Sequence, residues 1–229
     1  MKKFLNYFTT TEKILWCSSV ILIITSFLIF DRENYFTLLA SLIGVTSLIF
    51  CAKGNPIGQV LMVIFSIVYG IISYSFAYYG EMITYLGMSG PMAAFALIAW
   101  LKNPYKGKKS QVKVNKISKK ETVFMLVLSA LVTVLFYFIL KYFDTANLIP
   151  STISITTSFI AVYLTFRRSP YFAFVYAIND LVLVVLWTLV TLTDINYVSV
   201  LICFIVFFIN DIYGFISWLR MEKLQKNNM

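Results

Sequence analysis

Two short patterns in this sequence combine an amide, a carboxylate and a large aromatic ring within otherwise apolar stretches. They are Asn179-Asp180 with Trp187, and Asn210-Asp211 with Trp218. In both, the tryptophan follows the aspartate by seven residues, almost two helical turns, so the two side chains share a helix face. Ionisable groups in apolar surroundings are costly and mark functional sites by default. The patterns predict a pocket that hydrogen-bonds a polar ligand and stacks on a flat ring. Polar contacts that hold helices together are the alternative.

Other side chains could form the opposite wall of such a pocket. Gln59 and Tyr69 lie at helical spacing in one apolar stretch, and Tyr85 lies in the next. Taken singly, such residues more often serve helix packing than ligand contact. Together with the two Asn-Asp patterns, they form our candidate substrate site.

The composition shows which solvent surrounds these residues. Of 229 residues, 60% are hydrophobic and 13% are charged, and the mean hydropathy is +0.83. Soluble domains are about a quarter charged and need a polar exterior, so most of this chain lies in lipid. The sequence has no histidine, no Cys-x-x-Cys spacing and no P-loop motif. It therefore predicts no metal site, no cofactor and no enzyme activity.

A membrane span needs about 20 apolar residues, and eight segments qualify. They cover approximately residues 14–30, 35–52, 57–76, 82–101, 121–141, 151–166, 171–192 and 196–219. The first follows lysines, as in a signal peptide, but it has no small-residue cleavage site, so we predict an uncleaved helix. A short helix in the membrane interface is the alternative.

The basic residues predict the orientation, because cytoplasmic loops are enriched in lysine and arginine. With the N-terminus inside and eight spans, 17 of the 19 basic residues are cytoplasmic, and only Arg32 and Lys141 are not. Both termini are then cytoplasmic, in a bacterial inner membrane facing anionic lipid. The net charge of +9 follows from this topology. Nucleic-acid binding by the basic loop 103–120 is a weaker alternative.

The tryptophans differ in their expected depth. Trp100 and Trp218 fall near the cytoplasmic boundary, so we interpret them as residues of an interfacial aromatic belt. Trp187 lies deeper in its span and is the better candidate for stacking on a ligand.

The order of features in the two halves indicates an internal repeat. A basic turn ends at Pro56 in the first half and at Pro170 in the second, an offset of 114, and Trp100 precedes Trp218 by 118. One further span between two triplets makes the repeats parallel, as in SWEET transporters. We predict an all-α membrane protein with a 3+1+3 helix bundle of parallel repeats and an extra N-terminal helix. The segments are an N-terminal helix 1–30, a first repeat 35–102, a basic cytoplasmic loop 103–120, a linker helix 121–143, a second repeat 150–220 and a cytoplasmic tail 221–229.

From about residue 35 to 220, the chain resembles the PnuC family of nicotinamide riboside (vitamin B3) transporters, relatives of the SWEETs. The resemblance rests on Tyr79-Gly80-Glu81, Trp100, Asn179-Asp180-x6-Trp187 and Asn210-Asp211-x-Tyr213-Gly214-x3-Trp218. It implies facilitated diffusion of a nucleoside-like substrate, with trapping by a cytoplasmic riboside kinase, and often a homotrimer. It also implies a site between the repeats, formed by asparagines and tryptophans of the sixth and seventh helices, and it adds Tyr213 to our candidates.

One departure leaves the substrate open. Many family members end the third helix with Gly-Trp-x-x-Trp, whereas only Trp100 is present here. Asp180 and Asp211 suit the positive ring of nicotinamide riboside, but they suit thiamine equally well. Riboflavin and deoxynucleosides are further alternatives. Other classes are a substrate-capture subunit of an ATP-driven vitamin importer and, least favoured, a membrane enzyme.

Overall fold

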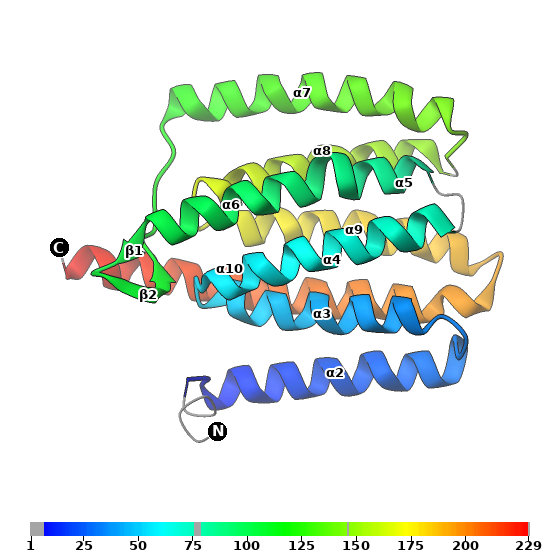
Figure 1. The fold of residues 1–229 in the computed structure, drawn as a ribbon, viewed down its shortest axis with the longest axis horizontal. Coiled ribbons are helices and arrows are strands. Elements are labelled where there is room, and N and C mark those ends of the chain that lie inside the picture. The colour runs from blue at the N-terminus through cyan, green and yellow to red at the C-terminus, as the bar shows by residue number, and fades with distance from the viewer. Residues whose placement is uncertain (1–6, 76–78, 146, 229) are drawn as a thin grey trace.

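The computed structural model describes residues 7–75, 79–145 and 147–228. Eight helices within these ranges are long and apolar enough to cross a membrane, which confirms the predicted all-α membrane fold. They lie side by side along the length of the molecule (Figure 1). Lys2 and Lys3, which we counted among the cytoplasmic charges, lie outside the described residues.

The elements follow the predicted order, with additions in three places: the third span, the basic loop and the turn before the last helix. They are α2 (Thr10–Phe30), α3 (Tyr35–Ala52), α4 (Pro56–Ser75), α5 (Tyr79–Ile83), the π-helix η1 (Thr84–Ser89), α6 (Gly90–Lys102), β1 (Pro104–Tyr105), β2 (Lys108–Val112), α7 (Lys119–Tyr142), α8 (Leu148–Phe166), α9 (Phe172–Thr191), the 3-10 helix η2 (Ile195–Tyr197) and α10 (Val198–Asn227).

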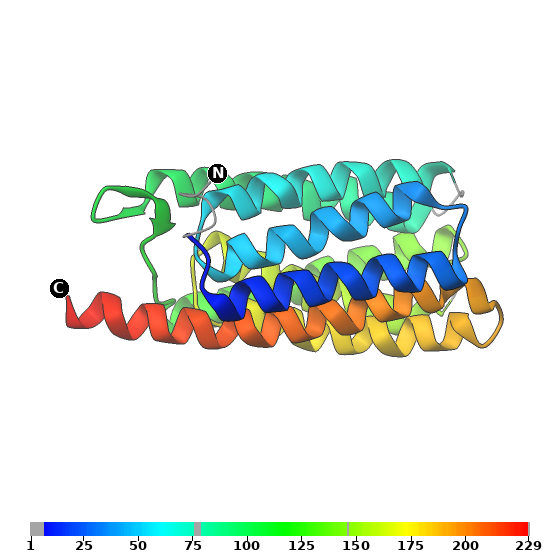
Figure 2. The ribbon, with the colours of Figure 1, turned by 90° about the horizontal axis from the view of Figure 1, so that it is seen from below.

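Six of the helices pack in a closed ring. Around it, α3 contacts α4, α4 contacts α6, α6 contacts α8, α8 contacts α9, α9 contacts α10, and α10 returns to α3. Outside the ring, α7 packs against α8, and α2 packs against both α3 and α10. Figure 2 shows α2 beside α10 from below. The ring defines an interior in which a polar site can be shielded from lipid.

The turns after α3 and α8 share one local structure. After α3, Gly54 has φ +65° and the Asn55 N–H donates to the Phe50 carbonyl at 3.0 Å. After α8, Arg168 has φ +57° and the Ser169 N–H donates to the Leu164 carbonyl at 2.9 Å. Both the left-handed residues and the bonds recur at the offset of 114 found in the sequence.

The third span differs from a regular helix. We predicted a single helix over 82–101, and the structure contains a π-helical turn, η1, between α5 and α6. A π-helical turn inside a helix commonly occurs at a functional site. It brings Tyr85 and Ser89 to the interior of the ring.

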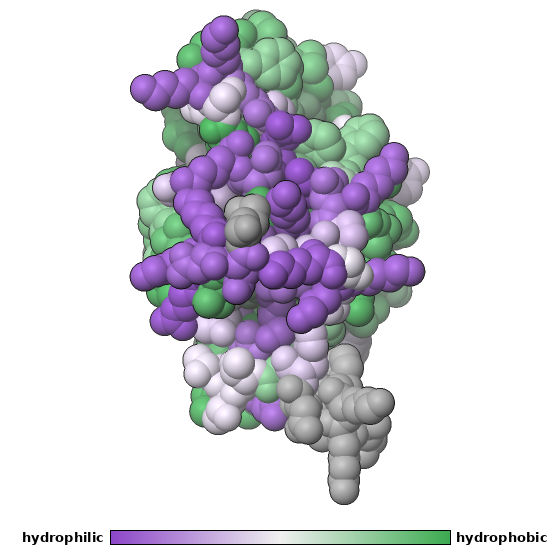
Figure 3. Space-filling model, turned by 90° about the vertical axis from the view of Figure 1, so that its left-hand side faces the viewer, coloured by the Kyte–Doolittle hydropathy of each residue, from purple (hydrophilic) through white to green (hydrophobic). Residues whose placement is uncertain are grey.

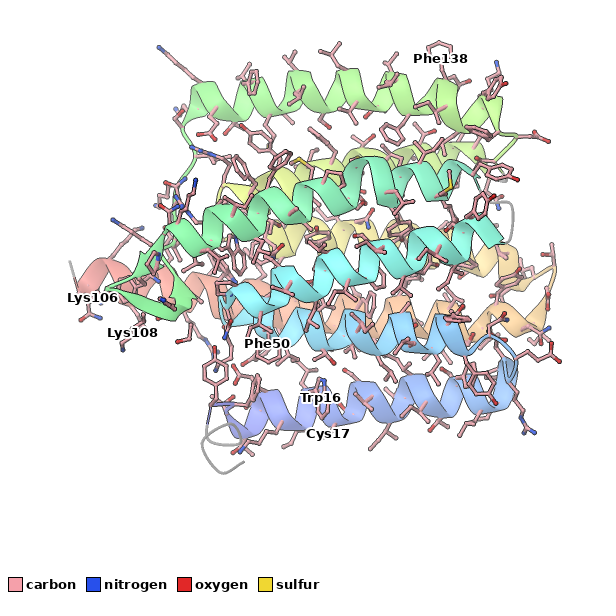
Figure 4. All side chains as sticks on the ribbon, in the orientation of Figure 1. Trp16, Cys17, Phe50, Lys106, Lys108 and Phe138 are labelled. Atoms are coloured by element: carbon pink, nitrogen blue, oxygen red, sulfur yellow. The ribbon has the colours of Figure 1, made fainter. Side chains whose placement is uncertain are left out.

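The basic loop 103–120 is more ordered than we predicted. Residues 104–112 form a two-stranded hairpin, and Val112 at its end is fully buried. Lys106 and Lys108 lie at the projecting end of this hairpin, whereas Phe138 on α7 points away from the bundle (Figure 4). Residues 221–227 of the predicted tail 221–229 continue α10 as helix.

Candidate functional site

A buried cavity of about 90 Å³ lies inside the ring of six helices. Residues from α3, α4, η1, α6, α8, α9 and α10 line it, so both halves of the chain contribute. Ligand pockets typically measure roughly 300–1,000 Å³. A nucleoside-sized ligand therefore requires the surrounding helices or side chains to move apart.

Asp180 and Asp211 meet at this cavity, although they lie on different helices. They are 4% and 5% exposed, and their carboxyl groups approach within hydrogen-bonding distance of each other. Asp180 Oδ2 has no hydrogen-bond partner among the described residues. Two adjacent carboxylates repel each other, and a proton or a cationic ligand relieves that repulsion. The pair is therefore suited to receive positive charge.

Asn179 lines the same cavity, and its amide oxygen is hydrogen-bonded to α8. Hydroxyl groups of three α8 residues donate to Asn179 Oδ1: Ser154 at 3.0 Å, Thr157 at 2.7 Å and Ser158 at 3.2 Å. Asn179 is only 5% exposed. The amide is consequently fixed in one orientation.

The candidates from the first half of the chain also reach the interior. Gln59 lines the cavity and donates from Nε2 to Cys51 Sγ at 3.3 Å. The rings of Tyr69 and Tyr85 lie 4.5 Å apart. Trp187 lies beside Phe204, with nearly parallel rings 6.4 Å apart.

Two further cavities continue from the first toward the opposite end of the bundle from the hairpin. The second, of about 80 Å³, shares Tyr85 and Asn179 with the first. The third, of about 120 Å³, shares Tyr69, Glu81 and Trp187 with the second. Asp31 and Asp194 line its outer part. Within the described ranges, five acidic residues line the three cavities and no lysine or arginine does.

Two predicted site residues, Asn210 and Tyr213, face away from the cavities. Asn210 Nδ2 donates to Ser19 Oγ at 2.9 Å and to the Val206 carbonyl, and the Tyr213 hydroxyl donates to Glu12 Oε1 at 3.2 Å. Ser19 and Glu12 belong to α2, which covers this face of α10. The structure therefore brings Asn179, Asp180, Asp211, Gln59, Tyr69, Tyr85 and Trp187 to the cavities and does not bring Asn210 and Tyr213 there.

Trp100 and Trp218 close the end of the ring near the hairpin, which our interpretation as belt residues missed. Both are fully buried, with ring centroids 5.4 Å apart. Trp100 Nε1 donates to the Thr165 carbonyl at 2.9 Å, and Trp218 Nε1 donates to the Cys51 carbonyl at 2.8 Å. A belt residue would face lipid headgroups, whereas these two fill the space between the two halves. Their equivalent positions in the repeat were the signal that could have shown this.

The chain between β2 and α7 crosses the same end as a strap, defined here as residues 112–115. It contacts the first half where the Val112 N–H donates to the Gly54 carbonyl, and the second half where the Asn115 N–H donates to the Arg168 carbonyl. The side-chain amide of Gln225 on α10 makes two hydrogen bonds to the strap: its oxygen accepts from the Val114 N–H, and its NH2 donates to the Val112 carbonyl. The strap thus joins both halves beyond the tryptophans.

The comparisons with known proteins show the family and the fold of this chain. A family model described as nicotinamide mononucleotide transporter matches residues 34–220. The chain belongs to this family. The nicotinamide riboside transporter PnuC of Neisseria mucosa is 20% identical over 199 residues, covering 85% of this chain and 76% of the relative. The crystal structure of the vitamin B3 transporter PnuC has the same fold, with a TM-score of 0.80, 19% identity, and coverage of 95% of this chain and 94% of that chain.

As a member of this transporter family, the protein is a multi-pass membrane protein. The family match begins at residue 34, after α2 has ended. The contacts that hold Asn210 and Tyr213 away from the cavities therefore come from a helix outside the matched region.

Proposed function

We propose that this protein takes up nicotinamide riboside across a bacterial inner membrane by facilitated diffusion. The substrate binds between the two halves of the chain, at the cavity lined by Asn179, Asp180 and Asp211. A riboside kinase then phosphorylates it in the cytoplasm, so that it cannot return.

The observation that carries this proposal is the row of three cavities with acidic and without basic lining residues in the described ranges. The nicotinamide ring of the riboside has a fixed positive charge, which Asp180 and Asp211 attract in a site of low dielectric constant. A mononucleotide also has a phosphate group, which the same carboxylates repel. This favours the riboside over the mononucleotide that gives the family its description.

The proposed architecture is a 3+1+3 bundle with parallel repeats. The first repeat contains α3, α4 and α5–α6, the second contains α8, α9 and α10, and α7 links them. Two observations support it: the matching turns at Gly54 and Arg168, and the contacts of each third helix with the first helix of the other repeat. Parallel repeats place a substrate site at their interface near the bilayer midplane.

Alternating access fits the closed end of the ring. We propose that Trp100, Trp218 and the strap form the cytoplasmic gate in its closed state. Both termini are then cytoplasmic, in agreement with the hydrophilic residues that gather at the hairpin end of the molecule (Figure 3). The homotrimer implied by the family resemblance stays a prediction, which cross-linking in native membranes can test.

Reconstitution tests the function directly. Proteoliposomes that contain this protein, a riboside kinase and ATP should accumulate labelled nicotinamide riboside, and liposomes without the kinase should only equilibrate with it. A thermal-shift panel of nicotinamide riboside, its mononucleotide, thiamine, riboflavin and deoxyadenosine identifies the preferred ligand. Uptake equal to that of protein-free liposomes would refute the proposal.

A further inference from the structure

Three hydroxyl groups converge on one oxygen atom at the junction of the first two cavities. Ser154, Thr157 and Ser158 of α8 all donate to Asn179 Oδ1, at 2.7 to 3.2 Å. An amide oxygen has two lone pairs, so three donors leave it no capacity to accept from a ligand. The group that Asn179 can still offer is its NH2.

The α8 hydroxyls differ in how they are used. Thr152, Thr156 and Thr165 each donate to the carbonyl four residues before them, the usual arrangement for a hydroxyl in a helix. The Thr157 hydroxyl also has carbonyls of its own helix within reach, Ile153 at 3.0 Å and Ser154 at 3.1 Å, but its contact with Asn179 Oδ1, at 2.7 Å, is the shortest of the three. Ser154 and Ser158 have no such bond within the described residues, and Asn179 Oδ1 is the acceptor of each. With the amide reversed, these two hydroxyls would lose their acceptor. The orientation with the oxygen toward α8 is therefore the favoured one.

The NH2 group is directed by the same bonds. Asn179 Nδ2 donates to no other residue in the described part of the chain, and Asn179 lines both the first and the second cavity. Its neighbour Asp180 has a buried oxygen, Oδ2, with no described partner. The two residues thus present a hydrogen-bond donor and an acceptor to one cavity.

We propose that Ser154, Thr157 and Ser158 are positioning residues that hold Asn179 as a donor, and that this donor and the acceptor of Asp180 recognise a primary carboxamide. The carbonyl of the ligand accepts from Asn179 Nδ2, and the ligand NH2 donates to Asp180 Oδ2. The inference rests on the proposed function, because nicotinamide riboside contains such a carboxamide. It goes further in assigning the specificity to hydroxyls on α8.

Thr157 provides the cleanest test. It lines none of the three cavities, so it acts on a ligand only through Asn179. The variant is Thr157→Val, and Thr157→Ser restores the hydroxyl. Thr156→Val is the matched control, because the Thr156 hydroxyl pairs with Thr133 on α7 at 2.7 Å, away from Asn179. Asn179→Asp is a second variant that keeps an acceptor for the hydroxyls and removes the NH2.

The readout is the affinity of the purified full-length protein for two ligands. One is nicotinamide riboside, and the other is N-ribosylpyridinium, which has the same charge and no carboxamide. Thr157→Val should weaken the binding of nicotinamide riboside about 10-fold, the effect of one lost or misdirected hydrogen bond. It should leave the affinity for N-ribosylpyridinium unchanged. Thr157→Ser and Thr156→Val should bind both ligands as the parent does. Asn179→Asp should lose the preference for the carboxamide while folding normally.

Each result decides one proposal. Equal weakening of both ligands by Thr157→Val, or no weakening, would overturn the positioning role and leave the transport function standing. In an Asn179→Ala background, Thr157→Val should have no further effect, since the two residues act as one unit. A parent that binds neither ligand would refute the proposed function. If the parent instead binds a panel ligand that has no primary carboxamide, the assignment of Asn179 and Asp180 to carboxamide recognition is overturned as well.

Discussion

Trp100 and Trp218 lie 5.4 Å apart, and each donates its indole N–H to a backbone carbonyl in the other half of the chain. The acceptors, Thr165 and Cys51, are 114 residues apart, the same offset that relates the two proline-terminated turns. The contact is therefore reciprocal, and both halves close the same end of the cavity. Separation of the halves at this end must break both bonds.

Trp218→Phe should loosen the proposed cytoplasmic gate. It keeps most of the ring and removes the bond to the Cys51 carbonyl, at a cost of about 1–2 kcal/mol, enough to raise the open population roughly 10-fold. Cys51 is buried, and its side chain lines the cavity behind the tryptophans. In a Cys17→Ser background, a maleimide added from the cytoplasmic side should label Cys51 about 10-fold faster in the variant.

Trp16→Phe is the matched control for this measurement. Trp16 lies on α2 (Figure 4), outside the ring of six helices; it is partly exposed, and its Nε1 donates to Thr46 on α3. In Trp16→Phe, the rate at which maleimide labels Cys51 should equal that of the parent. An unchanged rate in Trp218→Phe would show that the tryptophans do not limit access from this side.

The sequence was sufficient for the eight spans, because hydropathy and span length are local properties. It also singled out Asp180 and Asp211, which line the first cavity, since a carboxylate is rare in an apolar helix. The direction of a polar side chain was not available from the same information. Asn210 faces away from the cavity because a helix 191 residues earlier supplies Ser19 as its partner. Nothing local to Asn210 distinguishes it from Asn179.

Asp180→Asn and Asp211→Asn should each weaken the binding of nicotinamide riboside about 10-fold, because a buried charge interaction of about 1–2 kcal/mol is lost. The reduced riboside, whose ring is uncharged, is the matched ligand. Its affinity should change less than about 3-fold, since only a hydrogen-bond acceptor is altered. Isothermal titration of both ligands measures the difference. Equal losses for the charged and the reduced ligand would mean that the aspartates do not act on the positive charge of the ring.

Asn210→Ala should lower stability without changing ligand affinity. Asn210 is 2% exposed and bonds Ser19 on α2, so its removal costs about 1–2 kcal/mol of packing between α10 and α2. A thermal-shift measurement should show a lower melting temperature, with nicotinamide riboside bound within about 2-fold of the parent. Asn179→Ala, the same substitution in the cavity, should lower the ligand affinity, and it should also lower the melting temperature because Ser154 and Ser158 lose their acceptor. A large loss of affinity in Asn210→Ala would return Asn210 to the substrate site.

Gln225→Ala should release the strap. Gln225 is buried, and its amide accepts from the Val114 N–H at 2.8 Å and donates to the Val112 carbonyl at 3.0 Å. Without it, two backbone groups of the strap lose their partners, which favours local opening by about 1–2 kcal/mol. Lys113 and Lys116 are exposed, but trypsin cleaves beside them only when the backbone of the strap detaches from its hydrogen bonds, so cleavage there should become roughly 5- to 20-fold faster.

Asn228→Ala is the control for the strap, because Asn228 is exposed and, among the described contacts, its side chain bonds only the Leu224 carbonyl of α10. It should be cleaved at the rate of the parent. Bound nicotinamide riboside should alter the cleavage rate of the parent if the strap moves with the gate, because a ligand shifts an equilibrium only between states that it binds differently. In Gln225→Ala that dependence should diminish, since the strap is already detached. A strap cleaved equally fast in parent and variant would show that Gln225 does not hold it, and the gate would then consist of the tryptophans alone.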